Sequence, residues 1–337
     1  MNKVAVLGAG GWGTALAALL VGQGRSTTLW GRSPALVEEL RIKRENTPYL
    51  PGVTLPKELD LTSDLAAAVD GAEAVVLVVP AQAMRQVVQD LAGLLRSRPL
   101  VVSCAKGLER SSHLRMTQVI GELLPRESHR GIVALSGPNH AEEVGRRIPS
   151  ATVVASADER AAEEAQALFM TPQFRVYTNA DVIGVELGGA LKNIIALAAG
   201  VSDGLGFGDN TKAALMTRGM AEIARLGLAL GANPLTFAGL AGMGDLIATC
   251  TSLHSRNRAA GERIGRGESL EQILAGSRMV IEGVWTTTAA LELAEACGVE
   301  LPIAAGVRDV LFRGKDPREA VGELMERNPR AEEASFR

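Results

Sequence analysis

Cysteines, aromatic residues and long apolar runs are scarce in this chain of 337 residues, and its net charge is small. The three cysteines, Cys104, Cys250 and Cys297, are an odd number without a C-x-x-C spacing, so we expect neither a disulfide framework nor a metal site. They are instead typical of buried thiols in a protein of the reducing cytoplasm. The absence of about 20 uninterrupted apolar residues predicts no membrane span. A formal net charge of −3 gives no basic field for nucleic acid or a membrane surface.

What is present favours two globular domains of different character. A chain of this length usually forms about two domains, and 47% hydrophobic against 22% charged residues is enough to bury their cores. Up to about residue 180, short apolar runs alternate with helical segments, and beyond it the pattern is almost wholly helical with Gly or Pro stops. We predict an α/β Rossmann-type domain over residues 1–180, with a mainly parallel sheet covered on both faces, and an all-α domain over 181–337. The apolar runs lie at 4–7, 26–30, 74–79, 100–103, 132–135, 152–155 and 174–177.

The first apolar run leads into a G-x-G-x-x-G turn and then an Ala- and Leu-rich helix. Gly8 permits the tight turn, Gly10 lets the backbone approach a pyrophosphate, and Gly13 lets the helix lie close to the strand. Two alternatives are a Gly-rich turn that binds nothing and a signal peptide. Four glycines and Trp12 interrupt the apolar stretch, and the motif lies between a strand and a helix, so we predict a dinucleotide site.

The second strand indicates which dinucleotide is used. About 20 residues past the glycines, where an NAD enzyme carries an acid for the ribose hydroxyls, the chain has Arg32 and Ser33. A guanidinium can pair with a 2′-phosphate, so we predict NADPH as cofactor, with NADH also accepted because nothing repels it. The alternative for Arg32 is an ordinary solvated loop charge.

Polar residues also follow two later strands, where ligands of an open α/β sheet bind. Lys106 comes after the run 100–103, and Gly137 and Asn139 come after the run 132–135. Lys106 could reach cofactor and substrate together, or it could be a solvated lysine. The segment around Gly137 could equally be a plain turn.

The helical half contains three segments of chemical interest. Lys192 lies among Leu, Ile, Ala and Gly, where burial and nearby cations would lower its pKa toward the range of a general acid or base; a lysine whose head reaches water is the alternative. Asp245 follows a Gly-rich bend and could orient that lysine or bind a substrate hydroxyl, or simply cap a helix. The cluster Thr251–Arg258 is followed by a helix through Ile264, and its hydroxyl, guanidinium and amide groups suit a phosphate dianion.

These segments together resemble the bacterial-type NAD(P)-dependent glycerol-3-phosphate dehydrogenases over nearly the whole chain. The shared blocks are GAGGWGTALA at 8–17, AKGLE at 105–109, SGPNHAEEV at 136–144, VELGGALKN at 185–193, LAGMGDL at 240–246, SRNR at 255–258 and VIEGV at 280–284. The resemblance implies a Rossmann domain joined to an all-helical domain of the 6-phosphogluconate dehydrogenase type, in a cytoplasmic homodimer. It also implies interconversion of dihydroxyacetone phosphate and sn-glycerol 3-phosphate, which supplies phospholipid synthesis.

The resemblance assigns roles by position, with Lys192 as the acid and base. The implied substrate-binding residues are Lys106, Gly137, Asp245, Ser255, Arg256 and Asn257. The implied cofactor-binding residues are Gly8, Gly10, Gly11, Trp12, Gly13, Arg32, Ser33, Lys106, Asn139, Ala141, Arg256, Val280 and Glu282. Two departures are Gly11, where the family often has Ser, and Asn139 followed by His140, where Ser or Thr followed by Phe is common; the second leaves the contacts near residue 139 open.

Two other functions remain compatible with the sequence. A β-hydroxyacid dehydrogenase would also use a helical lysine, but a carboxylate substrate does not need the cluster Ser255–Asn257. A catalytically silent NADPH-binding sensor would not need Lys192 together with Asp245.

Overall fold

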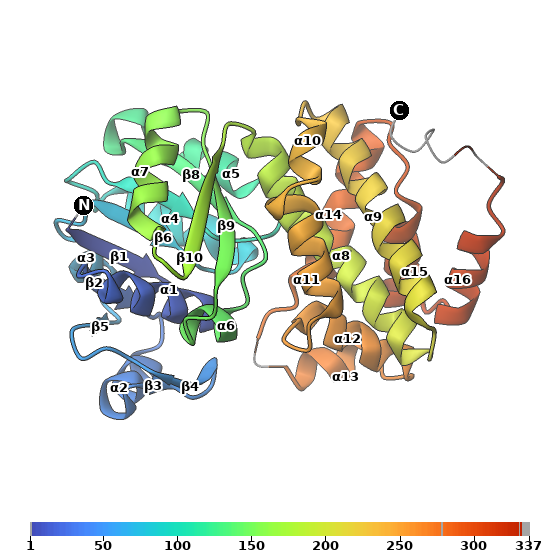
Figure 1. Ribbon diagram of the computed structural model, residues 1–337, viewed down its shortest axis with the longest axis horizontal. Helices are drawn as coiled ribbons and strands as arrows, with labels where there is room; N and C mark the ends of the chain where they lie inside the picture. The colour runs from blue at the N-terminus through green and yellow to red at the C-terminus, as the bar shows by residue number, and fades with distance from the viewer. Residues whose placement is uncertain (1, 278, 330, 332–337) are drawn as a thin grey trace. The chain divides into compact units, whose positions relative to one another are not determined.

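The computed structural model describes residues 2–277, 279–329 and 331, which form two compact units (Figure 1). The first unit contains the described residues up to Ala105 and the segment Met116–Val182, and the second contains Lys106–Arg115 and the described residues from Ile183 onward. Segment 106–115 joins the second unit because Leu108 is buried in the helical core and Arg115 pairs with Glu186 at 2.5 Å. The main boundary between the two units lies after residue 182. The helical unit also includes segment 106–115, which a single boundary near residue 180 would leave in the first unit.

The first unit is built on a sheet of eight strands in the order β10-β9-β8-β7-β6-β1-β2-β5. Every neighbouring pair is parallel except β8 and β9, and the central strands are buried on both faces. From β1 the chain adds β2 and β5 on one side and then returns to add β6 on the other, so the carboxyl end of β1 lies at the point where the strand order reverses. The strands are β1 (Lys3–Leu7), β2 (Ser26–Trp30), β5 (Asp60–Thr62), β6 (Ala74–Leu77), β7 (Leu100–Ser103), β8 (Gly131–Ser136), β9 (Ser150–Ala155) and β10 (Phe174–Asn179).

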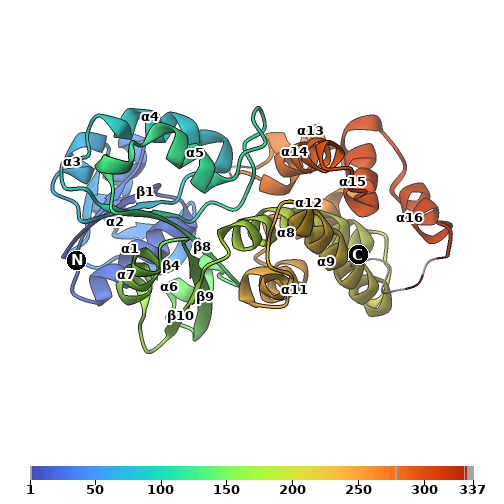
Figure 2. The ribbon, with the colours of Figure 1, turned by 90° about the horizontal axis from the view of Figure 1, so that it is seen from above.

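Helices cover both faces of this sheet. Figure 2 shows α3 (Leu65–Val69), α4 (Met84–Ala92) and α5 (Met116–Leu123) along one face and α1 (Gly11–Gly22) and α7 (Glu159–Phe169) along the other. The unit also contains α2 (Pro34–Lys43), α6 (Ala141–Gly145) and a small antiparallel hairpin of β3 (Glu45–Asn46) and β4 (Leu50–Thr54). The short 3₁₀ helices are η1 (Ala81–Ala83) and η2 (Arg126–Ser128).

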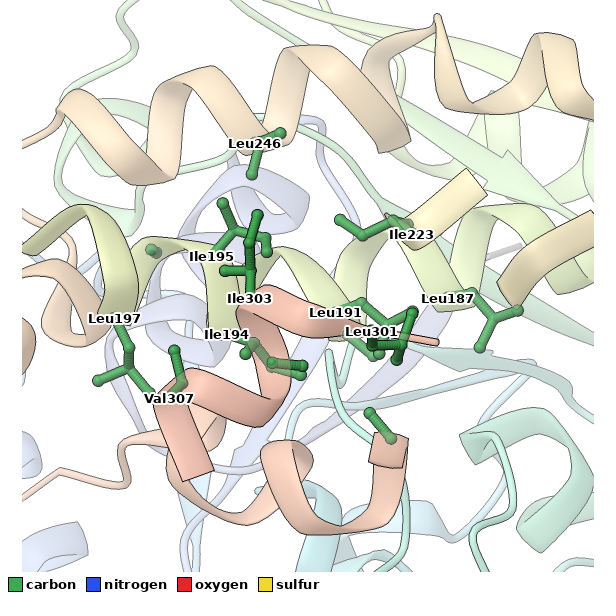
Figure 3. Packing of buried hydrophobic residues seen from close by; sticks show 14 of the residues in the cluster. Leu187, Leu191, Ile194, Ile195, Leu197, Ile223, Leu246, Leu301, Ile303 and Val307 are labelled. Atoms are coloured by element: carbon green, nitrogen blue, oxygen red, sulfur yellow. The ribbon is translucent and has the colours of Figure 1, made fainter. Parts of the chain in front are cut away.

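The second unit is helical and is organised around α8 (Val182–Gly204). Leu and Ile side chains of α8 belong to one buried cluster with side chains of α9, α11 and α15, of which Figure 3 labels Ile223, Leu246 and Ile303. By length and composition α8 could cross a membrane, but 83% of its apolar window is buried inside the protein, as expected for a core helix. The other helices are α9 (Asp209–Ala229), α10 (Pro234–Phe237), the π-helix η3 (Leu240–Gly244), α11 (Asp245–Thr251), α12 (Arg256–Gly265), α13 (Leu270–Ala275), α14 (Glu282–Ala296), α15 (Pro302–Arg313) and α16 (Pro317–Met325).

Helices α8 and α12 approach each other closely through glycines on both sides. A Cβ at Gly200 of α8 would lie 1.9 Å from the carbonyl oxygen of Arg258, and a Cβ at Gly261 of α12 would lie 2.0 Å from that of Leu197. Neither distance is possible between real atoms, so glycine is required at both positions. The contact is reinforced by Asp203 of α8, whose carboxylate accepts a hydrogen bond from Nε of Arg258 at 2.8 Å. It holds the N-terminus of α12 against the helix that carries Lys192.

Candidate active site

Lys192 lies in the middle of α8 with its side chain almost fully enclosed. Its Nζ donates hydrogen bonds to Oδ1 of Asp245 at 2.6 Å and to Oγ1 of Thr249 at 2.5 Å, both on α11. Its side chain is only 7% exposed, so Lys192 is not a lysine whose charged head reaches water, which was the alternative from the sequence. A lysine in the apolar centre of a core helix is therefore anchored by two polar groups of one neighbouring helix.

Asp245 receives a second lysine on its other oxygen. Its Oδ2 accepts a hydrogen bond from Nζ of Lys106 at 2.8 Å, and the residue is 1% exposed. The Gly-rich bend makes this possible, because η3 runs close to α8: a Cβ at Gly188, one turn before Lys192, would lie 2.5 Å from the carbonyl oxygen of Ala241. Asp245 thus links two lysines and does not serve simply as a helix cap.

This enclosure changes the acid–base properties of Lys192. Burial lowers its pKa to about 8; the carboxylate of Asp245 opposes that effect, and the ammonium of Lys106 adds to it. For Asp245, burial would raise the pKa, but the two ammonium groups outweigh burial and hold the pKa below its ordinary value. A lysine with a pKa near 8 exists in both protonation states near neutral pH, as a general acid and base requires.

A chain of amide contacts extends from this cluster to α12 and α14. Nδ2 of Asn193 donates to the backbone oxygen of Lys106 at 3.0 Å, and Nδ2 of Asn257 donates to Oδ1 of Asn193 at 2.9 Å. Oδ1 of Asn257 in turn accepts from the backbone N–H of Gly283 at 2.9 Å. The side chain of Asn257 therefore fixes the first turn of α12 to α8 and α14.

The first turn of α12 carries the residues expected to bind phosphate. Ser255 is the N-cap and accepts from the N–H of Arg258, while Nη1 of Arg256 donates to the backbone oxygen of Val280 at 3.0 Å. Glu282, two residues on, begins α14. The structure thus brings Arg256 and Val280 together, at a helix N-terminus whose positive dipole end favours an anion.

The three glycines of the first turn differ in why they are needed. Gly8 has φ 124°, and a Cβ there would lie 2.4 Å from the carbonyl oxygen of Val78; at Gly13 a Cβ would lie 1.9 Å from the oxygen of Gly8. Gly10 has φ −77° and ψ 179°, which any residue adopts, and a Cβ there would meet nothing within 4 Å. The fold requires Gly8 and Gly13, whereas the space over Gly10 is a cradle that a side chain would fill. That cradle lies at the sheet's switch point and fits a pyrophosphate against the N-terminus of α1.

The remaining predicted residues of the first unit lie at the same strand ends. Gly11 and Trp12 begin α1, and a Cβ at Gly11 would lie 3.5 Å from Cβ of Ala141. Arg32 is exposed in the loop after β2, and Ser33 caps α2 by accepting from the N–H of Leu36 at 3.3 Å.

The segment after β8 is bound to its neighbouring strand. Gly137 packs against Thr152, and Nδ2 of Asn139 donates to the backbone oxygen of Ala151 at 3.0 Å. Oδ1 of Asn139 accepts from the hydroxyl of Thr152 at 2.8 Å. The asparagine that departs from the family pattern therefore ties this loop to β9.

Comparison with known proteins identifies the family. Residues 3–162 match the family model of the NAD-dependent glycerol-3-phosphate dehydrogenase N-terminus, and residues 181–322 match that of its C-terminus. The chain belongs to the NAD-dependent glycerol-3-phosphate dehydrogenase family. A glycerol-3-phosphate dehydrogenase [NAD(P)+] of Bacillus cytotoxicus is 55% identical over 329 residues, which is 97% of this chain and 96% of that protein.

Solved structures agree with this assignment. A glycerol-3-phosphate dehydrogenase of Coxiella burnetii, at 37% identity, aligns with a TM-score of 0.92 over 97% of this chain and 99% of its own. A D-mandelate dehydrogenase solved with NADH and anilino(oxo)acetate has a TM-score of 0.60 at 14% identity, over 95% and 99% of the two chains, and shares the fold alone.

The predicted family, the two-part fold and the oxidoreductase class are confirmed. The predicted use of NADH and NADPH agrees with the naming of these glycerol-3-phosphate dehydrogenases. The roles of individual residues stay predictions.

Sequence reasoning did not single out two residues that the structure places in the cluster. Thr249 accepts from Lys192, and Asn193 joins Lys106 to Asn257. Thr249 follows Asp245 by four residues, a spacing that puts both on one face of a helix, so the signal was present once α11 was recognised. Asn193 gave no comparable signal, because its role depends on segment 106–115 joining the helical unit.

Proposed function

We propose that this protein catalyses the reversible NAD(P)H-dependent reduction of dihydroxyacetone phosphate to sn-glycerol 3-phosphate, with Lys192 as the general acid and base. The observation that carries the proposal is the buried cluster of Lys192, Asp245 and Lys106 in a chain of this family. The substrate is a small molecule, and the product would serve glycerophospholipid synthesis. A cytoplasmic location and a homodimer stay predictions.

The cluster supplies what ketone reduction demands of the protein. When bound, the reduced nicotinamide supplies a hydride to the carbonyl carbon. The C=O bond electrons move to oxygen, and Lys192 donates a proton from Nζ to the alkoxide as it forms. The ammonium of Lys106, also held on Asp245, stabilises the developing negative charge. In the oxidation direction neutral Lys192 accepts the hydroxyl proton.

Asp245 holds the two lysines in fixed positions in this scheme. One oxygen binds each Nζ, so both ammonium groups are oriented before substrate arrives. Thr249 fixes Lys192 from a second direction. Nζ of Lys192 has three N–H bonds, of which two are directed at Asp245 and Thr249, and we infer that the third is available to the substrate.

The N-terminus of α12 is our candidate for the phosphate site. Ser255, Arg256 and Asn257 would hold the phosphate through the guanidinium and the positive end of the α12 dipole, since the side chain of Asn257 is already engaged. Gly137 is the remaining proposed substrate residue. For the cofactor we propose the glycine turn with Trp12, Arg32, Ser33, Asn139 and Ala141, together with Lys106, Arg256, Val280 and Glu282.

The decisive experiment is the initial rate of NADPH oxidation with dihydroxyacetone phosphate, unphosphorylated dihydroxyacetone and a 3-keto acid in parallel. Strong preference for the phosphorylated ketone is the expected result, because the proposed α12 site suits a phosphate dianion and a carboxylate does not need it. Turnover of the keto acid alone would instead indicate a β-hydroxyacid dehydrogenase. NADPH binding without turnover of any substrate would indicate a sensor.

A further inference from the structure

Asn46 is a buried polar residue to which no role has been assigned above. It ends β3 of the small hairpin and is completely inaccessible to solvent. Its Nδ2 donates to the backbone oxygen of Ala9 at 3.0 Å and to Oγ1 of Thr14 at 2.7 Å. Within the described residues its Oδ1 has no hydrogen-bond partner. The amide orientation follows from chemistry, because the carbonyl of Ala9 can only accept.

The contact falls on the part of the glycine turn that a pyrophosphate would approach. Ala9 lies between Gly8 and Gly10, and the N–H of Thr14 makes the first helical hydrogen bond of α1 to the oxygen of Gly10 at 2.9 Å. Asn46 therefore holds both the peptide before the cradle and the first turn of the helix behind it. A carbonyl oxygen bound by Asn46 cannot rotate toward a phosphate, where it would repel the anion.

The rest of the hairpin supports the same turn. A Cβ at Gly11 would lie 2.6 Å from the backbone oxygen of Tyr49, so the hairpin backbone lies directly against the start of α1. Leu50 and Val53 of β4 pack with Ala15 of α1. The close approach of the Tyr49 carbonyl leaves no room for a Cβ at Gly11. The hairpin thus braces the glycine turn, with Asn46 as its polar contact.

We propose that Asn46 is a positioning residue for cofactor binding, which fixes the Ala9 peptide so that the glycine turn is preformed for the pyrophosphate. The proposal rests on the proposed cofactor site at this turn. A preformed turn affects how tightly the dinucleotide binds, whereas the acid–base chemistry is assigned to Lys192 and Asp245 of α8 and α11. Loss of Asn46 should therefore raise the Kd and KM for NADPH and leave the rate at saturating cofactor unchanged.

The test compares Asn46→Ala and Asn46→Asp with Glu45→Gln as matched control. Glu45 is the neighbouring residue of the same strand, and its carboxylate accepts from the N–H of Gly52 at 2.9 Å, away from the turn. Asn46→Asp has nearly the same shape but presents oxygen to the oxygen of Ala9. We expect the NADPH Kd, from cofactor fluorescence, to rise about tenfold or more in both variants. The kcat and the KM for dihydroxyacetone phosphate should change less than about twofold, and Glu45→Gln should match wild type.

A milder variant and a direct probe of the cradle separate the possible failures. Thr14→Val removes one acceptor with little change of shape, and an intermediate rise in Kd is expected even if the Asn46 variants fold poorly. Gly10→Ala fills the cradle without touching the protein, so it should weaken NADPH at unchanged melting temperature. Normal cofactor binding in Gly10→Ala would overturn the proposed cofactor site itself. Weak NADPH binding in Gly10→Ala, together with a wild-type Kd in Thr14→Val and in folded Asn46 variants, would overturn only the role of Asn46. A lower melting temperature of the Asn46 variants at unchanged Kd would overturn that role as well.

Discussion

The pH dependence of the reaction should follow the protonation of Lys192. Reduction requires the ammonium form, and with a pKa of about 8 roughly 90% of the enzyme carries it at pH 7 but about 1% at pH 10. The kcat for reduction should therefore be level below pH 7 and fall about tenfold for each pH unit well above 8. The kcat for oxidation should show the opposite dependence, rising toward a plateau above pH 8 because the neutral amine is the base.

Two neighbours should move this transition in opposite directions. Removing the carboxylate in Asp245→Asn takes away the charge that favours the ammonium, so the pKa of Lys192 should fall by about 1–3 pH units. Removing the ammonium in Lys106→Met takes away a like charge, so that pKa should rise. Both substitutions also lower the rate itself, because both side chains belong to the cluster. The diagnostic quantity is the position of the pH transition and not its height.

The assay is kcat at saturating cofactor and substrate between pH 6 and 10, in both directions, for wild type and the two variants. Lys192→Ala serves as reference and should lower kcat by about 10²–10⁴-fold with a modest change in KM. A kcat for reduction that stays nearly level up to pH 10, as the ordinary lysine pKa of 10.5 would give, or a transition that moves the same way in both variants, would refute the electrostatic reasoning. Near-wild-type kcat in Lys192→Ala would remove this residue from the mechanism.

Three further predictions concern stability and cofactor choice. Gly200→Ala should destabilise the protein by about 1–3 kcal/mol in urea unfolding, because its Cβ would collide with the carbonyl of Arg258, whereas Gly306→Ala in the open should be neutral or stabilising. Burial raises the pKa of Glu222 from 4.5 to about 7, so the native state keeps a proton that the unfolded state loses, and stability falls as pH rises from 4.5 to 7. Glu222→Gln should remove that slope in melting temperature measured against pH, and an unchanged slope would contradict the assignment. Arg32→Ala should raise the KM for NADPH more than that for NADH; an unchanged ratio of the two would show that Arg32 does not bind the 2′-phosphate.

Several elements of the fold could be predicted from the sequence because their signals are local. The strands at 26–30 and 100–103 were placed at their observed bounds, since apolar runs between turn residues mark buried parallel strands. The run at 74–79 was too long by two residues, because Val78 and Val79 continue the apolar pattern beyond the last strand pair. The edge strand β5 and the hairpin of β3 and β4 were missed, since two to five residues with few apolar side chains give no periodic signal.

The sequence by itself determined the glycine turn, the lysine in an apolar helix and the family, because each depends on residue types at fixed local spacing. Only the tertiary structure decided that Lys106 and Lys192 share Asp245, that Asn193 connects Lys106 to Asn257, and that Asn46 braces the first turn. These contacts join residues from 32 to 139 positions apart. The pKa of Lys192 likewise depends on burial by the surrounding helices, which no local pattern specifies.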